Sequence, residues 1–185
     1  MASIITATTT SGLTQSADNS GVLQLASGTG NLVTVPAVTG TAMVSGNMPA
    51  FSAYATANQS VTSGVATKIT LDAERFDTAN CFASSRFTPN VAGYYQINGT
   101  FRATGSSLTS SYLQLYKNGS VYQRLCEQNG NAITTLGSCI VYLNGSTDYI
   151  EAYGVVIASS GAAFDSVNST GEYSCGLNGC LIRSA

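Results

Sequence analysis

The chain contains no histidine and no tryptophan, and charged residues make up only 9% of its 185 positions. An average soluble domain carries roughly 25% charged residues. Without histidine the chain lacks the usual general base, the serine-hydrolase triad and the commonest metal ligand. The seven Lys and Arg residues are widely scattered, so no basic stripe is available to hold a phosphate backbone. We therefore expect neither an enzyme nor a nucleic-acid-binding protein.

Long hydrophobic segments are missing as well. No apolar run approaches the roughly 18 residues that suggest a membrane-spanning helix, so we expect no membrane insertion. The N-terminal sequence MASIITATTT has no basic start followed by a long apolar core, which argues against a secretory signal. No heptad repeat with charged flanks occurs, and this excludes a coiled coil.

The residues that are present favour β-structure. The chain is rich in Ser, Thr, Val and Ala and contains 10 Tyr, 6 Phe and 19 Gly, which suit pleated strands and tight turns. A surface with so few charges has two explanations. Partner subunits cover much of it, or neutral hydroxyl groups cover a rigid structural part. Both explanations point away from catalysis.

Aromatic residues divide the chain into two regions. All of them lie between Phe51 and Tyr173, and the first fifty residues hold a single charge, Asp18. The sequence SGNMP at residues 45–49 combines Gly, Asn and Pro and marks a boundary. We predict an N-terminal stem at residues 1–47 and a head domain at residues 48–185.

The stem is expected to contain short strands at residues 4–10, 22–26 and 32–35, with a weaker candidate at 38–44. Its apolar side chains are small or medium-sized, and one copy cannot bury enough of them to offset the entropy of the chain. Two interpretations remain open: a flexible arm, or a β-rich segment that intertwines with copies of itself. High apolar content with almost no charge favours intertwining. The predicted docking and stem-trimer residues are Ile4, Ile5, Leu13, Val22, Leu23, Leu25, Leu32, Val33 and Val35.

Alternation of polar and apolar residues predicts strands in the head. It is clearest at residues 94–102 and 112–116, and a longer strand is expected at 133–143. Asn118-Gly119 is a strong hairpin signal after the second of these. Turns recur about every ten residues, as they do in a β-sandwich.

Five segments of the head carry a family resemblance: residues 49–54, 87–97, 115–119, 143–151 and 177–182. In this order they resemble the trimeric jelly roll shared by the complement globular-head domain and the tumour necrosis factor superfamily. The most specific is FTPNVAGYYQI at 87–97, with a phenylalanine, a short turn, and then glycine and tyrosine entering a core strand. The fourth segment has one insertion, and the fifth has leucine where the family usually has phenylalanine.

This resemblance covers about three quarters of the chain. It implies a ten-strand jelly-roll β-sandwich, a homotrimer and recognition through surface loops, and it does not imply catalysis. The polar segments 105–111 and 158–171 are the predicted recognition loops. The residues predicted for the head core or the trimer interface are Phe51, Phe87, Tyr94, Tyr95, Ile97, Phe101, Tyr112, Leu115, Tyr149, Tyr153 and Leu181.

The stem segments at 3–13, 21–25 and 31–36 resemble low-charge repeats near the start of many bacteriophage fibre and virion proteins. This resemblance implies a virion structural protein that is assembled in the host cytoplasm. The stem would dock on other virion proteins, and the head would bind a host-surface glycan or protein. Two alternatives remain open: a capsid decoration protein, as a cement protein or head fibre that stabilises the shell, and a secreted trimeric adhesin or lectin.

The sequence offers few candidates for a metal or redox site, and no cofactor is expected. The five cysteines show no Cys-x-x-Cys spacing, which argues against zinc. They are either buried reduced thiols or form one or two disulfides. Asp72, Glu74 and Asp77 surround Arg75. We expect a solvated loop with a local ion pair there, with an oxygen-rich calcium site as the alternative.

Overall fold

The computed structural model describes residues 23–26, 32–35, 48–130, 134–166 and 173–185. The chain forms two compact units, Met1–Ala42 and Met43–Ala185, whereas the sequence places the boundary between residues 47 and 48. All regular elements of the described residues are β-strands. No helix in this part of the chain is long and apolar enough to cross a membrane. The all-β class predicted from composition is confirmed for the described residues.

The first unit contains a two-stranded antiparallel sheet. Strands β1 (Leu23–Ala26) and β2 (Leu32–Val35) pair along their whole length, and both lie where the sequence predicts strands. An isolated two-stranded sheet is at best marginally stable in water, so these strands need further contacts. The predicted stem residues Ile4, Ile5, Leu13 and Val22 lie outside the described residues, as do the strands predicted at 4–10 and 38–44.

The second unit is a sandwich of two sheets. Its strands are β3 (Ala50–Tyr54), β4 (Gln59–Ser60), β5 (Thr67–Lys68), β6 (Ala73–Asp77), β7 (Phe82–Ala83), β8 (Arg86–Phe87), β9 (Ala92–Ser106), β10 (Ser110–Lys117), β11 (Ser120–Asn129), β12 (Thr134–Asn144), β13 (Ile150–Ile157), β14 (Ser160–Phe164) and β15 (Gly176–Ser184). The β9 sheet has the order β4-β14-β9-β15-β3-β6, with β12 also paired to β9. The β13 sheet has the order β11-β10-β13-β8-β7, with β5 also paired to β13.

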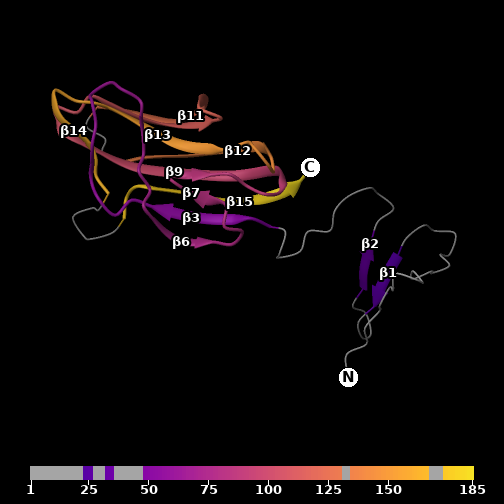
Figure 1. Cartoon of the computed structure of the whole chain (residues 1–185). Helices are drawn as coiled ribbons and strands as arrows, with labels where there is room; N and C mark the ends of the chain where they lie inside the picture. The colour runs from indigo at the N-terminus through magenta and orange to yellow at the C-terminus, as the bar shows by residue number, and fades with distance from the viewer. Residues whose placement is uncertain (1–22, 27–31, 36–47, 131–133, 167–172) are drawn as a thin grey trace. The chain divides into compact units, whose positions relative to one another are not determined.

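Connections between distant segments give the sandwich its jelly-roll character. The last strand, β15, lies between β9 and the first head strand, β3 (Figure 1). The resemblance implies ten strands, and the described residues of the head contain thirteen. The number therefore differs from the ten that the resemblance implies, and four of the thirteen strands, β4, β5, β7 and β8, have only two residues each. Two residues are too few to show a polar–apolar alternation.

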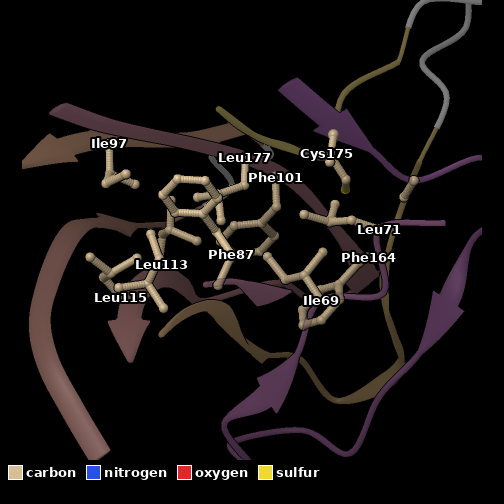
Figure 2. Close-up of a cluster of buried hydrophobic side chains, with 14 of the residues drawn as sticks. Ile69, Leu71, Phe87, Ile97, Phe101, Leu113, Leu115, Phe164, Cys175 and Leu177 are labelled. Atoms are coloured by element: carbon tan, nitrogen blue, oxygen red, sulfur yellow. The ribbon is translucent and has the colours of Figure 1, made fainter. Parts of the chain in front are cut away.

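The core lies between the two sheets and is built around aromatic pairs. Phe51 stacks on Phe87 with 4.2 Å between ring centroids, and Phe101 meets Phe164 edge-on at 5.3 Å. All four side chains are buried, and each such pair adds roughly 0.5–1.5 kcal/mol beyond the burial of its area. Figure 2 labels Ile69, Leu71, Phe87, Ile97, Phe101, Leu113, Leu115, Phe164, Cys175 and Leu177 in this core.

Gly154 on β13 allows the aromatic packing. A Cβ at this position would lie 2.7 Å from two ring carbons of Phe164 and 3.5 Å from Phe101. Real Cβ atoms do not approach this closely, so any larger residue would push the ring aside. The close approach of a ring from the opposite sheet therefore requires glycine here.

The outer edge of β12 is protected by side chains from the β10–β11 hairpin. β12 pairs with only one described strand, β9. Its carbonyl groups at Ile140 and Tyr142 accept hydrogen bonds from the Tyr122 hydroxyl at 3.4 Å and the Lys117 ammonium at 2.8 Å. Occupied carbonyls and a nearby charge discourage another strand from pairing there.

The two segments predicted as recognition loops are partly strand. Of residues 105–111, only 107–109 lie between β9 and β10. Residues 158–171 contain strand β14, which ends at the buried Phe164. The loop assignment was therefore wrong only at residues 105–106, 110–111 and 160–164, where Ser, Gly and Ala give little periodic signal. Residues 167–171 lie outside the described residues, and the recognition role of both segments stays a prediction.

Candidate interaction surfaces

The outer surface of the β9 sheet carries uncharged side chains across its centre. Its outward positions, which we call the neutral face, are Ser52, Phe76, Tyr94, Gln96, Asn98, Leu136, Ser138, Ile140, Tyr142, Asn178 and Cys180. Leu136 is 61% exposed, Ile140 52% and Phe76 50%. Leu136 and Ile140 share β12, whereas Phe76 lies on β6 on the other side of β9, β15 and β3. Exposed apolar side chains on one face indicate a candidate interaction surface.

A row of amides crosses the middle of the neutral face. The Gln96 side-chain NH₂ donates to the Asn98 carbonyl oxygen at 3.3 Å, and the Asn98 NH₂ donates to the Asn178 carbonyl oxygen at 3.0 Å. Beside this row is a hollow of about 310 Å³ with Phe76 and Cys180 in its lining. Paired amides are much less costly to desolvate than charges, so a partner can cover this face without burying an ion.

Tyr94 and Tyr95 lie on opposite sides of β9, as strand geometry requires. Tyr95 is fully buried and its hydroxyl donates to the Val91 carbonyl at 2.6 Å. Burial raises the pKa of the Tyr95 phenol. Tyr94 is 43% exposed and meets the Tyr142 ring edge-on at 5.5 Å. One tyrosine therefore serves the core and its neighbour serves the neutral face.

The residues predicted for the core or the trimer interface separate into three groups. Seven of them are buried in the sandwich: Phe51, Phe87, Tyr95, Ile97, Phe101, Leu115 and Leu181. Tyr94 lies on the neutral face. Tyr112, Tyr149 and Tyr153 are half-buried and lie with the outward side chains of the β13 sheet.

A buried carboxylate on the outer side of the β13 sheet binds two cations. Glu151 is 3% exposed. Its Oε1 atom lies 3.0 Å from the Lys68 ammonium and 3.0 Å from both Nε and Nη2 of Arg86. Lys68 belongs to β5 and Arg86 to β8, both two-residue strands. The ion pairs therefore hold these short strands against β13.

Tyrosine rings surround this carboxylate. The rings of Tyr116 and Tyr153 stack with centroids 3.7 Å apart and an interplanar angle of 18°. The Arg86 guanidinium lies 3.7 Å from the centroid of the Tyr149 ring. Burial and then the neighbouring Glu151 charge raise the pKa of the Tyr153 phenol. We call Lys68, Arg86, Tyr116, Tyr149, Glu151 and Tyr153 the Glu151 cluster.

Sequence reasoning missed the Glu151 cluster. Its two cations come from strands too short to recognise, and they are distant from Glu151 along the chain. One signal was present. Glu151 and Tyr153 both occupy outward positions of a strand whose inward neighbours are apolar, which marks that face as polar and aromatic.

The acidic segment at residues 72–77 is a strand edge. Asp72 accepts hydrogen bonds from the Thr56 backbone and hydroxyl, and these lower its pKa. Arg75 lies over the Tyr54 ring at 4.7 Å, and no ion pair joins it to these acids among the described residues. The expected solvated loop with a local ion pair was therefore wrong. In the described part of the chain no three potential metal ligands gather.

The five cysteines are free. Cys81 and Cys175 are buried, and Cys180 is exposed on the neutral face. Burial raises the pKa of the Cys81 thiol and raises that of Cys175 to about 11, so both buried thiols stay protonated and unreactive near neutral pH. Of the two interpretations left open, buried free thiols are confirmed for Cys81 and Cys175, whereas Cys126 and Cys139 are half-buried and Cys180 is exposed.

Acid should weaken the head through Asp148. Lys117 and Asn118 bind this carboxylate and lower its pKa below 3.8. A lowered folded-state pKa gives stability that is present above the unfolded pKa and is lost as pH falls through the folded value. We expect Asp148→Asn to cost about 1.5 kcal/mol at pH 7 and to flatten the loss of stability below pH 4. Urea unfolding of both proteins at several pH values measures this. An equal loss of unfolding free energy with falling pH in the two proteins would contradict the prediction.

No protein-family model and no curated protein sequence matches this chain. Solved structures do match it. Murine APRIL is 9% identical, with a TM-score of 0.53, 73% of this chain covered and 99% of that one. Eiger TNF from S. frugiperda is 9% identical, with a TM-score of 0.50 and coverages of 75% and 93%.

The globular domain of the zebrafish complement 1qA protein also matches, at 18% identity and a TM-score of 0.49, with 74% of this chain and 98% of that one covered. At these identities similarity concerns the fold alone. The APRIL and Eiger matches support the jelly roll implied by the resemblance of residues 49–182. The head of this chain has the β-sandwich fold of tumour necrosis factor-type proteins.

Proposed function

We propose that this chain is a non-enzymatic structural protein of a bacteriophage virion. Three copies form a short fibre, which the N-terminal stem anchors to the particle and whose jelly-roll head binds the host surface. The observation that carries the proposal is the neutral face, because an exposed apolar and amide surface of this kind needs a partner. The bacteriophage setting rests on the resemblance of the stem segments.

Self-association through the neutral face is supported by its chemistry. Tyr94 and Tyr142 supply rigid, amphipathic rings, and such residues are enriched in subunit interfaces. Leu136 and Ile140 supply apolar area next to them, and the amide row can pair with polar groups of another copy. The number of copies, three, is what the family resemblance implies. Low overall charge fits a protein whose surface is partly covered by sister chains.

Native mass and thiol reactivity test the assembly together. We expect light scattering at micromolar concentration to give three times the 19.0 kDa chain mass. Cys180 is exposed in the single chain, so the neutral-face interface should protect it from iodoacetamide in the assembled protein. Peptide mass spectrometry before and after dissociation by dilution measures this protection. A monodisperse 19.0 kDa species, or a trimer with fully reactive Cys180, would refute the interface.

A further inference from the structure

The Glu151 cluster contains a hydrogen-bond acceptor that the described residues leave unused. Both cations bind Oε1 of Glu151, and Oε2 has no hydrogen-bond partner among the described residues. Among the described residues, Ser110 Oγ is the only fully buried side-chain oxygen or nitrogen without a hydrogen-bond partner. Oε2 of Glu151 also has no partner there, so it is not fully buried. The Glu151 side chain keeps 4% of its surface exposed, and we infer that this exposed part is a narrow opening at Oε2.

The groups around this opening are held rigidly. Lys68 binds both Glu151 and the carbonyl of Ser84, the latter at 2.9 Å. Ser84 and Ser85 have φ values of 53° and 59°, a left-handed conformation that costs a residue with a side chain roughly 1–2 kcal/mol. The Ser85 hydroxyl secures this turn by bonding to the backbone of Leu71. These two residues form the two-residue turn between β7 and β8, which requires positive φ values at both positions, and the turn holds the Ser84 carbonyl in place for Lys68.

The charge balance of the cluster selects among ligand classes. Two cations and one carboxylate leave a net charge of +1, so what disfavours an anion here is direct contact with Oε2 and not the net charge. An anionic ligand that reached Oε2 would meet the carboxylate, and an ammonium ligand would meet Lys68 and Arg86. An uncharged polyol has neither penalty. Its hydroxyl groups can donate to Oε2 and accept from the third ammonium hydrogen of Lys68, which the two bonds above leave free.

The tyrosines supply the apolar surface that a sugar ring also needs. The stacked rings of Tyr116 and Tyr153 are half-buried, so each leaves part of its surface to solvent. Flat aromatic surfaces pack against the C–H faces of sugar rings, and their phenol hydroxyls add polar contacts at the rim. We propose that the Glu151 cluster is a binding site for an uncharged carbohydrate chain, with Glu151 Oε2 as the acceptor for sugar hydroxyls and the Tyr116–Tyr153 stack as the platform.

This inference deepens the proposed host-attachment role and rests on it for its biological meaning. The Glu151 cluster belongs to the β13 sheet, whereas the neutral face belongs to the β9 sheet, so one chain can use both surfaces. Sugar binding and oligomeric state are therefore measured separately on the same samples. A trimer without sugar binding would overturn this inference alone, and a sugar-binding monomer would overturn only the proposed trimer.

The full-length protein is tested by biolayer interferometry on immobilised dextran, yeast mannan and arabinogalactan, with heparin as the polyanion. We expect binding to at least one of the three neutral polysaccharides and an affinity that changes less than twofold between 50 and 500 mM NaCl. Tyr153→Ala should weaken polysaccharide binding at least tenfold, because it removes one of the two stacked tyrosine rings. Glu151→Gln should do the same, because the amide oxygen would stay with Lys68 and Arg86 and the NH₂ group, a donor, would take the place of Oε2. Tyr173→Ala removes an exposed tyrosine whose ring is tilted against that of Tyr54 and should leave binding unchanged.

Thermal melts accompany each variant, because Glu151→Gln weakens the ion pairs that hold β5 and β8. If that variant does not fold, Tyr153→Ala together with Tyr116→Ala decides the matter. Failure to bind any neutral polysaccharide overturns the inference. Binding to heparin alone also overturns it, as does equal binding by wild type and a folded Tyr153→Ala variant.

Discussion

Placing carboxylates on the neutral face should convert the assembled protein into monomers. Ile140→Asp with Tyr142→Asp puts two charges at positions that are 52% and 40% exposed in the single chain, so the fold can accommodate them. In the interface each charge would be buried without a partner at a cost of several kcal/mol. Since about 1.4 kcal/mol is tenfold in affinity, we expect association to weaken by at least a thousandfold. Light scattering at micromolar concentration should then give 19.0 kDa.

Val65→Asp is the matched control for this variant. Val65 is 49% exposed and lies outside the neutral face, so a charge there should leave the trimer intact. Far-UV circular dichroism confirms that both proteins keep their β-structure. An Ile140→Asp, Tyr142→Asp protein that stays trimeric would show that copies associate through another surface.

Charges in the stem should remove the protein from the particle while its head stays folded. Leu23→Asp with Leu25→Asp puts two carboxylates into strand β1, whose apolar residues are predicted to contact sister stems or a virion protein. A fifty-residue segment with this many apolar residues cannot leave them exposed without aggregating. We expect less than about a tenth of the normal amount of protein in purified particles, because buried unpaired charges oppose docking.

The control for the stem variant is Gln24→Asp, which places a charge in the same strand at a residue that is already polar. It should be incorporated normally. Gels of purified particles give the amount, and the thermal melt of the free protein shows whether the head is intact. Normal incorporation of the double variant would refute docking through the stem. Failure of both variants would mean that any charge in β1 disrupts the stem.

Local chemistry in the sequence determined much of the head. Asn118-Gly119 predicted a hairpin, and both residues adopt the positive φ values, 53° and 79°, that such a turn requires. The alternation at residues 94–102 predicted a strand, which is confirmed as part of β9, and neighbouring side chains in a strand point to opposite faces. These features depend on a few adjacent residues, so a single sequence reveals them.

Only the tertiary structure decided which outward residues share a surface. Phe76, Asn98, Asn178 and Ile140 are distant in the sequence, and the pairing of β6, β3, β15, β9 and β12 brings them onto one neutral face. The Glu151 cluster likewise needs β5 and β8, two-residue strands that have no periodic signal of their own. The need for glycine at residue 154 follows from a phenylalanine ring on the opposite sheet. Each of these depends on contacts between distant segments, which the pattern of neighbouring residues does not encode.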